Sequence, residues 1–176
     1  TAIQGGRAIL RYGLQKEGIS FNNELLKDYY QLYLSNYDKV LDNKSCNYHG
    51  VVETLSQLQS MSIKLGLCTN KPEKHARELL KRLGLIDFFK NSFIGSDTVG
   101  IAKPDPKPLL EAINRLNKTP QDVLFVGDTN TDAETAKNAG VDFIFCEYGH
   151  GSTYKLAKGE SAAFKIETFA DLISIY

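Results

Sequence analysis

Two aspartates four residues apart stand where an apolar run gives way to a helix. Leu124-Phe125-Val126 is typical of a buried strand, Gly127 allows the chain to turn, and Asp128 and Asp132 follow. Parallel sheets usually present their chemistry at the carboxyl ends of strands. Two unit charges about 4 Å apart repel by roughly 4 kcal/mol at an effective dielectric near 20. If the carboxylates converge, the sequence predicts a positive group between them, and a divalent cation meets that need.

Two other interpretations of this pair are available. Asp132 alone fits a helix-start carboxylate favoured by the helix dipole, but this leaves Asp128 unexplained. A calcium loop would use Asp128, Asn130 and Asp132 as its first, third and fifth positions. Its sixth position would be Ala133 instead of glycine, and its twelfth Ala139 instead of a bidentate glutamate. The calcium-loop interpretation therefore fails.

Polar side chains also follow the apolar run 63–69. Thr69 supplies a hydroxyl and Asn70 an amide just before a predicted helix, whose free N–H groups favour an anion. The alternative is a helix N-cap, a position that both residue types suit.

A lysine lies in the loop between two later elements. Lys103 opens a segment that contains three prolines, at 104, 106 and 108, and these would fix the direction of its ammonium group. The alternative is a solvated surface lysine. We favour that alternative for Lys107 and Lys118.

The hydrophobic pattern predicts two blocks. Residues 9–37 are helical in pattern, and after residues 42–44 helices and strands alternate. The expected helices cover 50–60, 72–83, 109–116, 133–140 and 169–173, and the expected strands cover 63–69, 92–95, 123–126, 141–146 and 163–166. Such alternation implies right-handed crossovers and a mostly parallel sheet. We therefore expect a three-layer α/β core over residues 48–176 and a small helical cap over residues 1–47.

Composition excludes several function classes. Hydrophobic residues make up 42% and charged residues 24% of the 176 residues, which is typical of a globular protein. The net charge of +0 gives no sign of a nucleic-acid or membrane partner. No run is long enough to span a membrane, and no signal peptide opens the chain. Three scattered cysteines without a C-x-x-C pair favour free thiols, and we expect a cytoplasmic protein.

The order of these pieces resembles a known superfamily. The segments Cys68-Thr69-Asn70-Lys71-Pro72, Lys103-Pro104-Asp105-Pro106-Lys107-Pro108 and Val126-Gly127-Asp128-Thr129-Asn130-Thr131-Asp132 resemble motifs two, three and four of the haloacid dehalogenase-like (HAD) superfamily. Their amino-acid sequences are similar to those of the phosphoglycolate phosphatase branch, and Tyr148-Gly149-His150-Gly151 fits that branch too. The resemblance covers roughly Tyr48 to Tyr154 and implies a Rossmann-like core.

The resemblance implies a magnesium-dependent phosphatase acting on a small phosphorylated metabolite, with phosphoglycolate the first candidate. Thr69 and Asn70 would hold phosphoryl oxygens through hydroxyl and backbone N–H contacts. Lys103 would balance charge between the phosphate and the nucleophile. Asp128 would ligate Mg²⁺, and Asp132 would hold Lys103 or a metal-bound water. Positioning and charge stabilisation dominate such a reaction.

One expected element does not occur in these residues. Enzymes of this superfamily attack phosphorus with the first aspartate of an Asp-x-Asp-Gly-Thr element that ends the first core strand, and the second acts as general acid and base. Neither is present, so we expect an N-terminally truncated, inactive form. The strands 63–69 and 123–126 would then be unpaired edges, open to rearranged pairing or to association with another copy.

Other functions stay open. A sugar-phosphate mutase of the same superfamily would use the same motifs. A non-catalytic phosphate- or metal-binding protein would account for the missing nucleophile. The cap should set specificity, and within it Gly5-Gly6-Arg7 is a candidate substrate contact, because the glycines allow close approach and Arg7 pairs readily with a carboxylate. A helix-start turn with a solvated arginine is the alternative.

Overall fold

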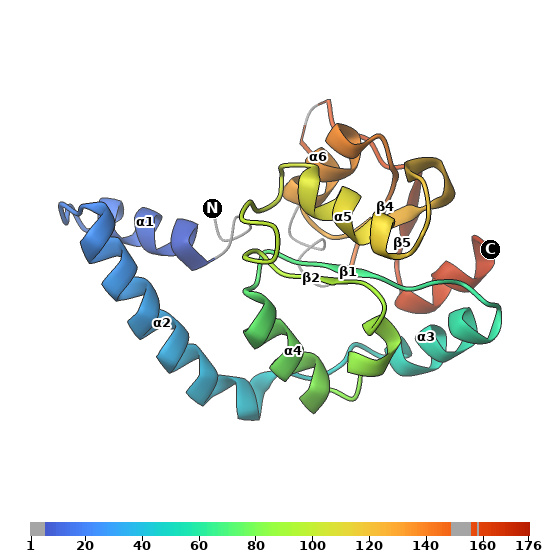
Figure 1. Cartoon of the computed structure of the whole chain (residues 1–176), viewed down its shortest axis with the longest axis horizontal. Coiled ribbons are helices and arrows are strands. Elements are labelled where there is room, and N and C mark those ends of the chain that lie inside the picture. Colours follow the sequence, from blue (N-terminus) through green and yellow to red (C-terminus); the bar gives the residue numbers. More distant parts are fainter. Residues whose placement is uncertain (1–5, 149–155, 158) are drawn as a thin grey trace. The chain divides into compact units, whose positions relative to one another are not determined.

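The computed structural model of the chain describes residues 6–148, 156–157 and 159–176. The chain divides into two compact units, Thr1–Cys46 and Asn47–Tyr176. Figure 1 shows the first unit as blue helices and the second as alternating helices and strands. The sequence placed the boundary after residue 47, and the structure places it after Cys46. The role of the first unit as a cap stays a prediction.

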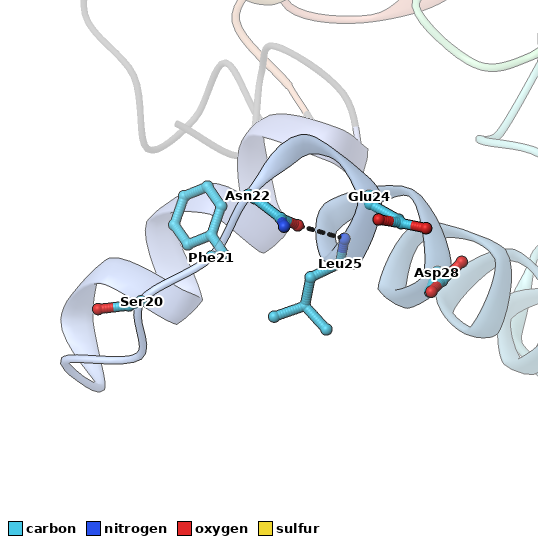
Figure 2. Close-up of a pocket in the computed structure, with 6 residues that line it drawn as sticks. All are labelled: Ser20, Phe21, Asn22, Glu24, Leu25 and Asp28. Carbon is cyan, nitrogen blue, oxygen red and sulfur yellow. Dashed lines mark hydrogen bonds between the residues drawn. The ribbon is translucent and has the colours of Figure 1, made fainter.

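The described part of the first unit, residues 6–46, contains two helices, α1 (Gly6–Lys16) and α2 (Asn23–Lys44). Residues 17–22 separate them, so the helical block expected over 9–37 is interrupted. The side-chain oxygen of Asn22 accepts a hydrogen bond from Leu25 N at 2.8 Å and caps α2. Figure 2 shows this cap in a shallow hollow that contains none of the predicted site residues.

Gly6 and Arg7 take part in packing within this unit, and Gly5 lies outside the described residues. A side chain at Gly6 would come within 2.7 Å of the Tyr33 ring, so this glycine permits close packing of α1 on α2. The Arg7 guanidinium lies 4.9 Å from the centroid of the Tyr30 ring, which is a cation–π distance. Substrate contact by Arg7 stays a prediction.

The second unit alternates helices and parallel strands. Its elements in chain order are α3 (Val51–Ser60), β1 (Leu67–Cys68), α4 (Glu73–Arg82), the 3₁₀ helix η2 (Ile86–Phe89), β2 (Phe93–Ile94), α5 (Lys107–Arg115), η3 (Pro120–Asp122), β3 (Leu124–Gly127), α6 (Asn130–Ala139), β4 (Asp142–Cys146), β5 (Phe164–Ile166) and η5 (Phe169–Ser174). The described strand pairs are all parallel. The predicted α/β fold class is confirmed. The closing helix expected over 169–173 is the 3₁₀ helix η5.

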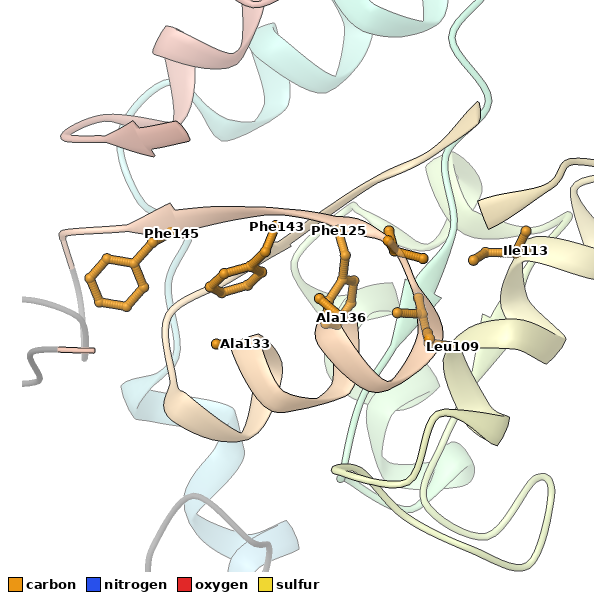
Figure 3. Close-up of a cluster of buried hydrophobic side chains, with 9 residues drawn as sticks. Leu109, Ile113, Phe125, Ala133, Ala136, Phe143 and Phe145 are labelled. Carbon is orange, nitrogen blue, oxygen red and sulfur yellow. The ribbon is translucent and has the colours of Figure 1, made fainter. Parts of the chain in front are cut away.

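Strand β4 shows why the core has three layers. Its side chains alternate between two apolar clusters, so both of its faces are buried. Phe143 and Phe145 lie on the face of β4 that packs on α6, where Ala133 and Ala136 give the aromatic rings room to approach (Figure 3). Ile144 and Cys146 face the other cluster, which contains Leu58 of α3, Ile166 of β5 and Leu172 of η5.

The strands form two separate sheets instead of the single sheet expected. One has the order β1-β2 and the other β3-β4-β5. In the part of the chain that the structure describes, β1 and β3 do not pair with each other, nor has another described strand filled the place between them. Strand 63–69 shortens to Leu67–Cys68 because only these residues form ladder pairs with β2. Association with a second copy at these edges stays a prediction.

Candidate active site

A buried ion pair joins two of the predicted site residues. The Lys103 ammonium lies 2.6 Å from Asp132 Oδ1, and the two side chains are only 10% and 9% exposed. Lys103 Nζ also donates to Cys68 O at 3.0 Å and lies 5.2 Å from the centroid of the Phe125 ring. The surface-lysine interpretation of Lys103 is therefore wrong.

The neighbouring lysines have the environment expected for them. Lys107, at the start of α5, and Lys118, between α5 and η3, are both exposed. Burial and pairing therefore distinguish Lys103 from Lys107 and Lys118.

The second carboxylate oxygen of Asp132 accepts hydrogen bonds from the two residues that precede α6. Asp132 Oδ2 accepts hydrogen bonds from Asp128 N at 3.3 Å and Thr129 N at 3.2 Å, and from Thr129 Oγ1 at 2.6 Å. Thr129 Oγ1 in turn accepts from Asp132 N, which completes a capping box at the start of α6. Asp132 is therefore a helix-start carboxylate, as one interpretation of the sequence proposed. Asp132 has the Lys103 ammonium as a positive partner, and a cation between Asp128 and Asp132 stays a prediction.

Asp128 lies at the carboxyl end of β3. Its half-buried side chain comes directly after Gly127, which is paired with Phe145 of β4. Burial is the main cause that raises the pKa of Tyr148, the interaction with Cys146 adds to it, and the negative charge of Asp128 makes a smaller contribution. This places the carboxylate at the edge of the sheet where β3 and β4 both end.

Thr69 and Asn70 do not cap the following helix, so the N-cap interpretation is wrong. Helix α4 begins at Glu73, whose N–H donates to Asp97 Oδ1 at 2.7 Å. Thr69 N donates to Ile94 O at 2.9 Å, which extends the pairing of β1 with β2. The Asn70 side chain instead contacts the main chain of Lys103. Asn70 thus contacts Lys103 directly. Thr69, whose hydroxyl accepts from Lys71 N at 3.2 Å, directly follows Cys68, whose carbonyl accepts from Lys103 Nζ.

Sequence reasoning missed the groups that fix the start of α4. Glu73 accepts hydrogen bonds from Thr98 Oγ1 and Arg77 Nε, and Asp97 accepts from the helix N–H. These contacts hold the pKa of Glu73 below its usual value, with the Thr98 hydrogen bond the largest cause. The polar loop Ser96-Asp97-Thr98 follows a predicted strand and would have been the available signal.

Gly127 has no room for a side chain. A Cβ atom there would lie 2.5 Å from Asp132 Cβ and 2.7 Å from Asp132 Cγ. We expect Gly127→Ala to lower the free energy of unfolding by about 1–3 kcal/mol, because the carboxylate must move away from Lys103. Gly13→Ala is the matched control: nothing lies within 4 Å of its Cβ position, and alanine favours the helix. Equal effects of the two changes in urea unfolding would contradict the close approach.

The thiol of Cys68 should be unreactive although it lies beside the Lys103 ammonium. Burial raises its pKa from 9.0 to about 11, and this outweighs the lowering by Lys103. At pH 8 such a group is only about 0.1% thiolate. We expect iodoacetamide to label the exposed Cys46 at least about 10-fold faster than Cys68, as followed by mass spectrometry. Comparable rates in the folded protein would be evidence against this burial, and urea should bring the rates together.

The described residues contain no group of three or more His, Cys, Asp or Glu side chains that could hold a metal ion by themselves. Mg²⁺ does not need such a group, because it often uses one or two carboxylates and takes its other ligands from water and substrate phosphate.

Among the described helices, none has the length and apolar character needed to cross a membrane.

Comparisons with known proteins place this geometry in a family. The model of the haloacid dehalogenase-like hydrolase family matches residues 8–140. A phosphoglycolate phosphatase of Rhodospirillum rubrum is 41% identical over 125 residues, which are 71% of this chain and 51% of that protein. One from Yersinia pseudotuberculosis is 31% identical over 96% of this chain and 72% of its own length.

The fold comparison agrees. A crystal structure described as a predicted phosphoglycolate phosphatase from Haemophilus somnus superimposes with a TM-score of 0.81 at 26% identity, over 94% of this chain and 72% of that one. The chain spans about half the length of the Rhodospirillum rubrum relative. On the family match, these relatives and the shared fold, the chain belongs to the haloacid dehalogenase-like hydrolases and is similar to their phosphoglycolate phosphatases.

Proposed function

We propose that the protein to which this chain belongs is a magnesium-dependent phosphatase that hydrolyses a small phosphomonoester, with phosphoglycolate the favoured substrate. The observation that carries the proposal is the buried Lys103 ammonium, held by Asp132 and by Cys68 O at the carboxyl end of β1. The names of the relatives support the choice of phosphoglycolate. A cytoplasmic location belongs to the same proposal.

The ammonium suits a phosphoryl group. Among the described residues Lys103 Nζ donates to two acceptors, and an ammonium has three donors, so one remains for a phosphoryl oxygen. A charge fixed in a buried site is worth more than the same charge in water, and it needs no reorganisation during the reaction. The Thr69 hydroxyl and the Asn70 N–H would hold the other oxygens.

Asp128 is the proposed ligand of Mg²⁺. It supplies one hard carboxylate at the sheet edge, and substrate phosphate and water would complete the coordination. Bound there, the ion would neutralise charge on the transferring group. Asp132 would act indirectly, because its two oxygens already hold Lys103 and the start of α6.

The proposed reaction proceeds through a phospho-aspartate, and the 176 residues contain no Asp-x-Asp-Gly-Thr element to supply that aspartate. We therefore propose that this polypeptide is inactive by itself. The first unit would act as the cap that selects the organic part of the substrate.

The test compares residues 1–176 with the protein expressed from its complete reading frame. Both are assayed with a panel of phosphate esters, with Mg²⁺ and with EDTA. We expect Mg²⁺-dependent release of phosphate by the complete protein, fastest with phosphoglycolate, and none by residues 1–176. Absence of turnover in the complete protein would refute the proposed function. Isomerisation of a sugar phosphate without release would identify a mutase instead.

A further inference from the structure

Lys103 is held at both ends by the segment 68–70, which includes the last residue of β1. At its main chain, Lys103 N donates to Asn70 Oδ1 at 2.9 Å, and Lys103 O accepts from Asn70 Nδ2 at 3.0 Å. At the tip of its side chain, Nζ donates to Cys68 O at 3.0 Å. Cys68 and Asn70 are two residues apart, so the Lys103 side chain extends alongside this segment, from Asn70 at its main chain to Cys68 at its ammonium group.

Asparagine is well suited to this contact. Its amide carries an acceptor and a donor side by side, so one side chain serves both the N–H and the C=O of a single residue. An ionised aspartate would only accept, and an alanine would do neither. The contact is partly buried, so leaving the Lys103 N–H and C=O without a partner there would destabilise the folded protein.

A second asparagine contacts the same loop in a different way. Asn138 Nδ2 donates to Pro104 O at 3.2 Å from an exposed position on α6. It makes one hydrogen bond to this loop where Asn70 makes two, and that bond goes to Pro104 and not to the main chain of Lys103. Asn138 therefore provides a matched control for the effect of an amide contact on this loop.

We propose that Asn70 is a positioning residue for the Lys103 ammonium. Its side chain fixes the Lys103 main chain, so that Nζ reaches Cys68 O and Asp132 together and keeps its remaining proton for the phosphoryl group. The inference rests on the proposed function, and assigns the Asn70 side chain a task separate from phosphate contact through its N–H. A displacement of about 1 Å in such a group can lower a rate about 100-fold.

The kinetic test uses the complete protein and its preferred phosphate ester with Mg²⁺. We expect Asn70→Ala to lower kcat by about 10- to 100-fold, with KM changed less than about 3-fold. Asn70→Asp keeps the acceptor for Lys103 N, so its kcat should lie between the kcat of the unmodified protein and that of Asn70→Ala. In a Lys103→Met background, Asn70→Ala should lower kcat by less than about 3-fold, because the group that it positions is gone. Asn138→Ala should leave kcat within about 2-fold.

A folding test needs no activity. Thermal unfolding is measured for Asn70→Ala, Lys103→Met and the double variant. If Asn70 positions the ammonium, the drop in Tm caused by Asn70→Ala is at least about 2 °C smaller in the Lys103→Met background. Equal drops in both backgrounds would overturn the proposal, even in an active enzyme. Coupled drops in a protein that hydrolyses no ester would uphold the positioning contact and refute the proposed function.

Discussion

Lys103→Met is expected to lower the free energy of unfolding by about 3 kcal/mol or more. The change leaves the Asp132 carboxylate, which is 9% exposed, without its cation, and it leaves Cys68 O without its donor. Removing one partner of a buried ion pair costs about 3–5 kcal/mol in other proteins. The hydrogen bonds from Thr129 to Asp132 remain and favour the lower end of that range. Urea unfolding at pH 7 measures the effect.

Two variants control this result. Lys118→Met removes an exposed lysine and should change the free energy of unfolding by no more than about 0.5 kcal/mol. Lys103→Met combined with Asp132→Asn should recover part of the loss, because no buried charge is then left alone. A loss below about 1 kcal/mol for Lys103→Met alone would show that the pair is solvated or formed only part of the time.

Asp128→Asn is expected to lower the Mg²⁺-dependent phosphatase activity of the complete protein by at least about 100-fold. An amide keeps the shape of the side chain but removes the charge that would bind the metal. The fold should survive, because the Asp128 contact to Asp132 comes from the main-chain N–H, which asparagine retains.

The matched control for Asp128→Asn is Asp142→Asn. Asp142 is exposed and begins β4, whereas Asp128 follows the end of β3, and these strands are parallel. The control therefore removes the same charge from the opposite edge of the same sheet, and activity should stay within about 2-fold. Activity of Asp128→Asn above about one third of the unmodified level, at saturating Mg²⁺, would remove Asp128 from the proposed metal site.

Much of the fold follows from local pattern. The apolar runs predict the limits of β3 and β4 within a few residues, and Gly140 predicts the end of α6. These limits can be predicted because both faces of β4 are buried and because β3 and α6 directly precede it in the chain. The limits of β1 could not be predicted in this way. They depend on how many residues pair with β2, which is a property of distant segments and not of the run 63–69 itself.

The site shows the same division. Residue types and spacing indicate Thr69, Lys103, Asp128 and Asp132, since each follows a strand or lies in a stiff loop. The pairing of Asp132 with an ammonium 29 residues away is one of two expectations that come from the family resemblance and not from spacing, and neither source indicates that the Asn70 amide contacts the main chain of Lys103. Such contacts depend on where the loops meet in space.

The most direct test of the central claim is a crystal structure of the complete protein grown with Mg²⁺ and tungstate, an unreactive phosphate analogue. The account predicts the anion within about 3 Å of Lys103 Nζ and Thr69 Oγ1, and a metal about 2.1 Å from an Asp128 oxygen. Lys103 should still contact Asp132. An anion bound away from Thr69 and Lys103, or a metal that does not touch Asp128, would contradict the account.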